Sequence, residues 1–304
     1  MSDITQLKSK ETGTVYDIKD ATSRINSTNL LTWEECDRAV MASTGGRNIA
    51  DIPEFASAIT SAGSIYAFLH ARASAANFAG LRLGDYINVP CGIYGTRRFE
   101  IAGFDTYYQC GDTAMGHHIV FVDSSPVAIP ASDEHACKVN TSYLMWNATA
   151  TNQGTADENC PYLASGLHDW EINNFLPAFP SALQGYMLER REWLETRYSA
   201  SGNLNASTGA AWKSMGKIWS LSEMEVYGTV VWGTPGYTVG ISRQLPLFAI
   251  NPKKNLNGSR VIWWLRSVSG SSASHVCYVR HYGIASYNSA TYDWCRPRCG
   301  FLLG

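Results

Sequence analysis

The chain has 304 residues, of which 45% are hydrophobic, 16% are charged and 12% are aromatic, with 10 Trp and 16 Tyr. Disordered chains carry more charge and fewer aromatic residues, so this composition predicts a folded protein. The 24 basic and 26 acidic residues give a net charge of −2. No basic field is available for a phosphate backbone, which argues against nucleic acid as a partner.

Residues 1–28 are polar, and we expect them to form an N-terminal arm with one extended run at residues 14–18. The polar start indicates no signal peptide. No run of eighteen apolar residues is present, so no membrane insertion is expected. In a chain without an export signal, the eight scattered cysteines are expected to be reduced.

Residues 29–75 are predicted to be a helical segment. Thr32 and Glu35 have the spacing of a capping box before a helix over residues 36–41. Pro53 marks the start of a second helical stretch that continues to about residue 75. This stretch is rich in alanine and poor in charge, so we expect it to pack against another protein surface, such as that of a further copy of the chain.

Residues 76–304 are predicted to form one α+β domain with long irregular loops. Strands are expected at 81–89, 117–122, 217–222, 226–232 and 261–266. Between them, Ser181 and Gln184 predict the start of a helix that runs to Tyr198, with residues 189–192 on its outer face. Strands and helix are segregated rather than alternating, which favours α+β over a parallel α/β fold.

The common catalytic signatures are absent: the sequence contains no GxGxxG, GxxxxGK[ST], HExxH or GxSxG motif. The histidines at 117–118 could suggest a metal site, but neighbours on a strand point to opposite faces. The clusters at 133–135 and 168–169 are interpreted as structural. Glu223 and Glu225 are either a pair of working carboxylates or two glutamates near the positive end of a short helix.

The stretch that follows VIWWLR has an unusual composition. Residues 269–293 are rich in Ser, Tyr, Ala and His, and they contain no Lys, Glu, Gln, Met or Trp. Those five types make up 43 of the 304 residues, so their absence from so long a stretch is uncommon. Tyr and Ser make good ligand contacts. A polar hairpin with solvent-facing tyrosines remains the alternative.

Several motifs of this chain resemble one known family. They are WWLRS (263–267) followed by Gly283, Ala285, Ala290 and Arg296-Pro297, with LRLGDYINV (81–89), WSLSEMEVYG (219–228) and QLPLFA (244–249) upstream. Together they resemble the C-type-lectin-like domain of phage tail proteins and of the variable proteins of diversity-generating retroelements. The opening GTVYDIKDATSR (13–24) is similar to the start of many phage tail-fibre proteins. The likeness covers residues 76–304 and the arm.

The resemblance implies an adhesin whose residues 268–295 form a variable ligand-binding region. In such systems an error-prone reverse transcriptase replaces adenines, typically at the first two positions of Asn codons. These changes cannot produce Lys, Glu, Gln, Met or Trp, and residues 269–293 contain none of the five. The resemblance implies that the displayed, diversified residues are Ser269, Ser271, Ser272, Ser274, Tyr278, Arg280, His281, Tyr282, Ile284, Ser286, Tyr287, Asn288, Ser289, Thr291, Tyr292 and Asp293.

A second group of residues is expected to form the scaffold beneath this region. It consists of Trp263, Trp264, Leu265, Arg266, Gly283, Arg296 and Pro297. Arg266 is expected to donate hydrogen bonds to carbonyl groups under the variable loop. Trp294 cannot arise by the adenine route, so it is expected to be scaffold or a fixed anchor.

The implied protein is a phage or prophage tail receptor-binding protein of the virion, made in the bacterial cytoplasm. Its expected partners are a host surface protein or glycan, other tail proteins through the arm, and two further copies in a trimer. No catalytic residue, metal or cofactor is expected. Two alternatives remain: a copper oxidase of the formylglycine-generating type that uses Cys295 and Cys299, and a purely structural tail component.

Overall fold

The computed structural model describes residues 6–8, 15–17, 46–236, 243–251 and 260–304. Residues 1–41 and 42–304 form two separate compact units. In the first unit, β1 (Gln6–Lys8) pairs antiparallel with β2 (Val15–Asp17), which confirms the extended run in the arm. The helix expected over residues 36–41 lies outside the described residues.

The second unit begins with short helices. η1 (Ile49–Asp51) is followed by α3 (Pro53–Ala62) and α4 (Ile65–Ser74), which confirms the helical prediction for this stretch. Gly63 adopts a left-handed conformation (φ 80°) that ends α3, and the Ser64 hydroxyl accepts a hydrogen bond from the N–H of Ala67 to begin α4. The stretch is therefore two helices rather than one.

The largest sheet is antiparallel and contains six strands. They are β3 (Tyr86–Pro90), β4 (Thr96–Phe104), β5 (Ile119–Asp123), β6 (Met187–Leu188), β9 (Ile218–Ser220) and β13 (Cys299–Leu303), with η2 (Gly92–Tyr94) between β3 and β4. The order is β3-β4-β5-β13-β6, and β9 also pairs with β13. Every residue of β13 is buried, and β13 pairs with β5, β6 and β9, so it is an interior strand of this sheet. The strands expected near residues 81–89, 117–122 and 217–222 are all found here.

Two smaller antiparallel sheets and several short helices complete the unit. β7 (Arg191–Thr196) pairs with β8 (Gly209–Ser214), and β10 (Trp263–Val268), β11 (His275–Val279) and β12 (Ala285–Ser289) form a three-stranded sheet. The helices are α5 (Gly166–Trp170), η3 (Glu171–Phe175), η4 (Leu176–Ala178), α6 (Ser181–Gln184), α7 (Glu223–Tyr227) and α8 (Pro246–Ile250). The unit combines helices with antiparallel sheets, which confirms the α+β prediction.

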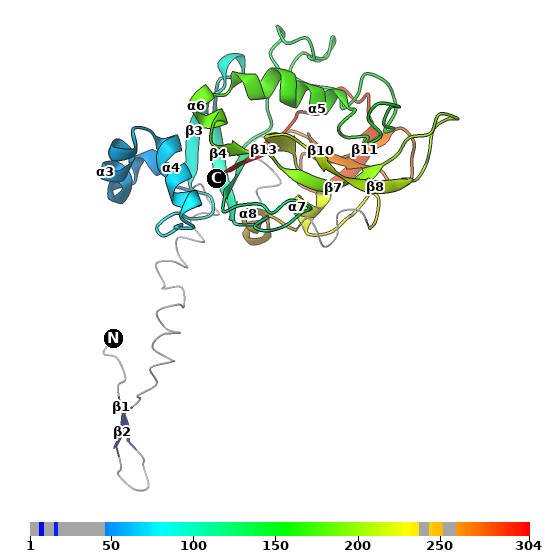
Figure 1. Ribbon diagram of the computed structural model, residues 1–304. Coiled ribbons are helices and arrows are strands. Elements are labelled where there is room, and N and C mark those ends of the chain that lie inside the picture. Colours follow the sequence, from blue (N-terminus) through cyan, green and yellow to red (C-terminus); the bar gives the residue numbers. More distant parts are fainter. Residues whose placement is uncertain (1–5, 9–14, 18–45, 237–242, 252–259) are drawn as a thin grey trace. The chain divides into compact units, whose positions relative to one another are not determined.

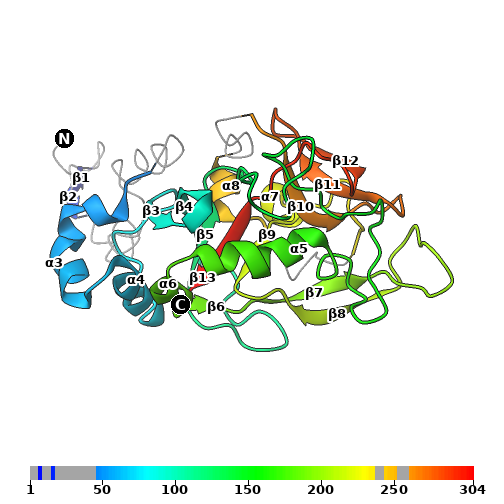
Figure 2. The same ribbon diagram turned by 90° about the horizontal axis from the view of Figure 1, so that it is seen from above.

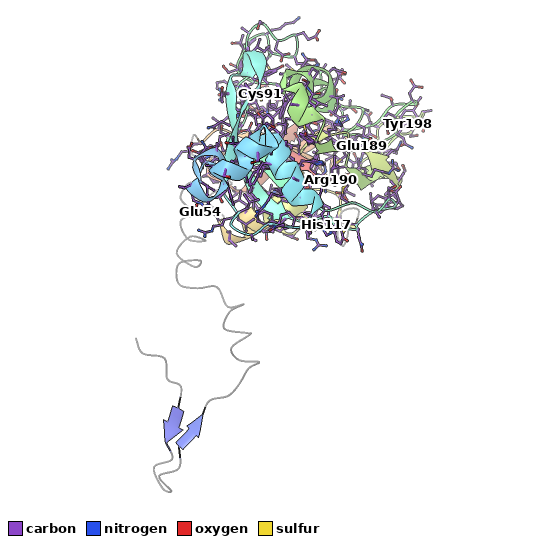
Figure 3. All side chains as sticks on the ribbon, turned by 60° about the vertical axis from the view of Figure 1, so that its left-hand side comes forward. Glu54, Cys91, His117, Glu189, Arg190 and Tyr198 are labelled. Carbon is purple, nitrogen blue, oxygen red and sulfur yellow. The ribbon has the colours of Figure 1, made fainter. Side chains whose placement is uncertain are left out.

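The long helix predicted from Ser181 to Tyr198 is wrong. Only α6 is helical, and the chain then extends through β6 and β7, so that Arg190 and Tyr198 lie far apart in Figure 3. Arg190, Glu192 and Leu194 are buried at every second position, which is the period of a strand. The outer charged face expected at 189–192 is therefore also wrong, because two of its charges point into the core.

The strand predicted over residues 226–232 is also wrong. Its first residues belong to α7, which starts at a capping box formed by Ser222 and Glu225 and ends at Gly228 with φ 75°. The helix-start interpretation of Glu223 and Glu225 is thus the correct one for these residues.

Within the second unit, α3 and α4 lie at one end and β10–β12 lie at the opposite end (Figures 1 and 2). The six-stranded sheet lies between them and supplies much of the core. Among the described residues, no helix is long and apolar enough to cross a membrane.

Candidate ligand-binding surface

The stretch that the sequence singled out is built into the three-stranded sheet. β11 and β12 form a hairpin in which Cys277 is opposite Tyr287 and Tyr278 is opposite Ser286. At its tip, the N–H of Gly283 donates to the carbonyl of Arg280 (2.8 Å). Gly283 has a φ of 89°, a conformation that L side chains rarely adopt, so its glycine is needed to close the turn.

The predicted scaffold lies beneath this hairpin. Trp263, Trp264 and Leu265 are fully buried, and the indole N–H of Trp264 donates to the carbonyl of Leu144 (2.7 Å). The chain returns alongside at Arg296, whose carbonyl accepts the N–H of Trp264 (2.9 Å). The carbonyl of the buried Pro297 accepts the N–H of Val127 (2.8 Å). These bonds attach the first strand of the sheet to the rest of the domain.

Arg266 differs from its expected role. Its guanidinium donates to one carbonyl, that of Ser220 (3.0 Å), and otherwise to the carboxylates of Glu225 and Glu192. Glu225 also accepts from Arg190, which in turn pairs with Glu192. The result is a buried network of two arginines and two glutamates below the sheet, in which each charge faces an opposite one.

Burial alone would raise the pKa of Glu225, but Arg190 and Arg266 outweigh it and hold that pKa well below its usual range. Since an unfolded glutamate titrates near about 4.3, the charged carboxylate stabilises the fold above that pH, and this contribution is lost only as the pH falls through the lower folded value. We therefore expect the carboxyl ¹³C resonance of Glu225 to show no titration step between pH 7 and about pH 3.5. A midpoint near the unfolded value would contradict the network.

The predicted display residues differ widely in exposure. Five are exposed: Ser271, His281, Tyr282, Ile284 and Tyr287. Eight are partly buried: Ser272, Ser274, Arg280, Asn288, Ser289, Thr291, Tyr292 and Asp293. Three are buried: Ser269, Tyr278 and Ser286.

The expectation that these last three residues are displayed is corrected by their burial. Tyr278 and Ser286 are opposite each other on one face of the hairpin, and the ring of Tyr278 meets Trp264 edge-on at 6.1 Å. Ser269 is buried, and its backbone carbonyl accepts a hydrogen bond from the guanidinium of Arg197 (2.9 Å). Alternation along a strand turns every second side chain inward, whatever its polarity.

The other end of the sheet carries hydroxyl groups that bond to one another. Ser272 lies 2.7 Å from Nδ1 of His275, and Ser289 lies 2.9 Å from Thr291 between their hydroxyl oxygens. The side-chain amide of Asn152 donates to the carbonyls of Ser272 (2.8 Å) and His275 (2.7 Å). This end is held in place by its own polar contacts.

The turn and the first part of β12, in contrast, carry exposed large apolar side chains beside the polar Arg280 and His281. Tyr282, Ile284 and Tyr287 are exposed on the hairpin, and Val231 and Trp232 are exposed on a separate loop. The ring centroids of Trp232 and Tyr287 are 4.8 Å apart. We call these five residues the tip surface. Sequence reasoning missed Val231 and Trp232, because an apolar pair between Gly228 and Gly233 also has the pattern of a strand.

Trp294 is half exposed and packs on Tyr143, with 5.7 Å between their ring centroids. It is therefore not part of the buried framework, which leaves its interpretation as an anchor.

The histidine clusters have structural partners. His117 lies 2.7 Å from the carboxylate of Asp105, and the buried His118 accepts the N–H of Tyr107. His135 lies 2.9 Å from a carboxylate oxygen of Asp169. Over the described ranges, no three His, Cys, Asp or Glu side chains are grouped to hold a metal ion.

Cys295 and Cys299 are both fully buried, and the thiol of Cys299 donates to Glu171 (3.7 Å between Sγ and Oε1). Burial raises the pKa of both thiols well above the usual value.

Comparison with known proteins gives one match. The sequence model of a family described as "Domain of unknown function (DUF6273)" matches residues 137–302, which is more than half of the chain and includes all three strands of the β10–β12 sheet. No curated protein and no solved structure matches the sequence. By the extent of that match, the chain belongs to the DUF6273 family.

Proposed function

We propose that this chain is a phage or prophage tail receptor-binding protein with a C-type-lectin-like domain. Its hairpin of β11 and β12, within a region diversified by a retroelement, would bind a ligand on the surface of a host bacterium. The arm would attach the protein to other tail proteins, and the chain would act as a trimer in the virion. It would need no metal or cofactor.

The observation that carries the proposal is the tip surface. Large apolar side chains that a folded domain usually buries are exposed on the turn and on β12, with Tyr282, Ile284 and Tyr287 all from the stretch of biased composition. The rings of Trp232 and Tyr287 are in contact, and exposed apolar surface of this kind is typical of interaction sites. Beneath it, Trp263 and Trp264 form a rigid support. A diversified receptor-binding protein requires surface residues that can vary in type on a framework that stays the same.

The arrangement of the second unit adds support. β10–β12 lie at the end opposite α3 and α4, the helices nearest the arm in sequence (Figure 2). Within the second unit, the hairpin thus lies away from the helices that follow the arm in the sequence, and it is open to a partner there.

The test is binding of the fluorescently labelled full chain to intact cells of a panel of bacteria. On any strain that binds it, Tyr287→Ser should lower the apparent affinity by at least about tenfold, because exposed aromatic residues are the usual anchors of interfaces. Tyr108→Ser is the matched control: Tyr108 and Tyr287 are both 37% exposed, but Tyr108 stacks on His117 away from this hairpin.

Equal binding by the two variants, with both folded, would place the binding site elsewhere. The diversification has its own test in the genome. We expect a near-copy of the DNA for residues 263–297 that differs almost only at adenines, close to a reverse transcriptase gene. If no such copy accompanies the gene, diversification by a retroelement is wrong, whatever the cell-binding result.

A further inference from the structure

Val231 and Trp232 are exposed although they lie outside the stretch of biased composition. Their side chains are 47% and 44% exposed, which is close to the 46% of Tyr282 and the 52% of Ile284. They come from the loop between α7 and α8, whereas the other three residues of the tip surface come from the β11–β12 hairpin. The two segments meet where the ring of Trp232 contacts that of Tyr287, so each contributes a large exposed side chain at that point.

A buried carboxylate holds this loop in place. Glu223 accepts hydrogen bonds from the backbone N–H groups of Val231 (2.9 Å), Trp232 (3.1 Å) and Gly233 (2.8 Å). Three donors on one carboxylate make a strong anchor, because charge-assisted hydrogen bonds are about twice as strong as neutral ones. The N–H of Glu223 in turn donates to the hydroxyl of Ser267 on β10, which links the anchor to the framework strand.

The indole of Trp232 is also oriented. Its Nε1–H donates to the carbonyl of Ala285 (3.2 Å), and its ring lies against that of Tyr287. The backbone carbonyl of Trp232 accepts the N–H of Gly270 (2.9 Å). The single polar group of the side chain is therefore already satisfied within the protein. What the exposed part of Trp232 offers to a partner is carbon surface, held in one orientation.

We propose that Trp232 and Val231 are a fixed part of the binding surface, and that the partner they fit is an apolar patch on a host surface protein. This inference rests on the proposed function and assigns the chemistry of the same surface. Variation within residues 269–293 would change the hairpin, while the loop held by Glu223 supplies the same contact to each variant.

The side chains on the surface favour a protein over a glycan. Ile284 and Val231 have no group that can hydrogen-bond to sugar hydroxyls, and they gain free energy only by leaving water for an apolar partner. Trp and Tyr beside aliphatic residues are the typical composition of the centre of a protein–protein interface. Arg280, whose guanidinium lies 3.3 Å from the hydroxyl of Tyr282, adds a donor at the edge.

The experiment uses the full chain and a bacterial strain whose intact cells bind it. Trp232→Ala should weaken binding about thirtyfold, which is the usual loss for an aromatic anchor. Ile284→Ala should weaken it about fivefold or more. Ile93→Ala is the matched control, since Ile93 is 61% exposed but lies in η2, and it should leave binding within about twofold. Each variant is accepted only if its unfolding midpoint in urea matches that of the unaltered protein.

The class of the partner is tested on the cells. Treatment with proteinase K should abolish binding of the unaltered protein, and periodate oxidation of surface sugars should leave it intact. Loss of binding after periodate, with or without loss after protease, would overturn the assignment to a protein patch and favour a glycan.

Different results contradict the fixed contact and the proposed function. If Tyr287→Ser loses binding but Trp232→Ala does not, the fixed contact is wrong and the proposed function stands. If both folded variants bind as well as the unaltered protein, this surface is not the receptor-binding site and both are wrong.

Discussion

Replacing Glu225 with alanine is expected to lower the free energy of unfolding by about 3–5 kcal/mol, the usual cost of leaving buried charges without their partner. Glu225 is fully buried and accepts hydrogen bonds from Arg190, Arg266 and the hydroxyl of Tyr107 (2.7 Å). Its removal leaves two buried guanidinium groups with one glutamate, Glu192, between them. Chemical denaturation at pH 7 measures the change.

Glu54→Ala is the control for the loss of a glutamate. Glu54 is exposed in the first turn of α3, where its charge near the helix N-terminus contributes about 0.3–1 kcal/mol. A loss at Glu225 no larger than this would mean that the two arginines do not depend on it, and that the network described below the β10–β12 sheet is not formed in solution.

Trp264→Ala is expected to cost about 3–5 kcal/mol, because it removes a large buried side chain and leaves a cavity. The indole is fully buried, donates to the carbonyl of Leu144, and meets the rings of Tyr278 (6.1 Å) and Tyr292 (6.4 Å) edge-on. Trp264 supports the hairpin through its contact with Tyr278 of β11, so we also expect Trp264→Ala to speed amide hydrogen exchange in β11 and β12. Both effects are measurable on the isolated protein.

Trp294→Ala is the matched control for this variant. Trp294 is 50% exposed and packs on the side chain of Tyr143, so its truncation should cost less than about 1 kcal/mol and leave exchange in the hairpin unchanged. Equal costs at the two positions would show that Trp264 is not the support of the hairpin.

The framework of the candidate site could be predicted from the sequence. Trp263, Trp264 and Leu265 are consecutive large apolar residues, and they have no stable place other than a buried strand. Gly283 was likewise expected in the scaffold, and it forms the turn at which its φ of 89° requires a glycine. Each of these signals is local, so it could be read without knowing what packs against it.

The charged residues could not be placed in this way. Arg190 and Glu192 were expected in solvent because charges are rarely buried without partners. Their partner Glu225 is 35 residues from Arg190 along the chain, and no local pattern reveals that pairing. For the same reason Glu223 could be recognised as a helix-start glutamate but not as the acceptor for the loop at Val231–Gly233.

Exposure was the other property that the sequence did not reveal. The bias in composition at residues 269–293 indicated a surface stretch, yet Tyr278 is buried and Tyr287 is exposed. The two residues have the same side chain and lie on neighbouring strands of one hairpin. Which of them faces the framework depends on strand register, and a shift by one residue would exchange the two faces.

Sequence alone therefore establishes an α+β protein with a buried tryptophan strand and a biased stretch after it, because periodicity and composition are local properties. Only the tertiary structure decides that Arg190, Glu192, Glu225 and Arg266 share a buried network, and that Trp232 joins Tyr287 on the tip surface. The physical reason is that the free energy of a buried charge or an exposed ring depends on partners brought close by folding.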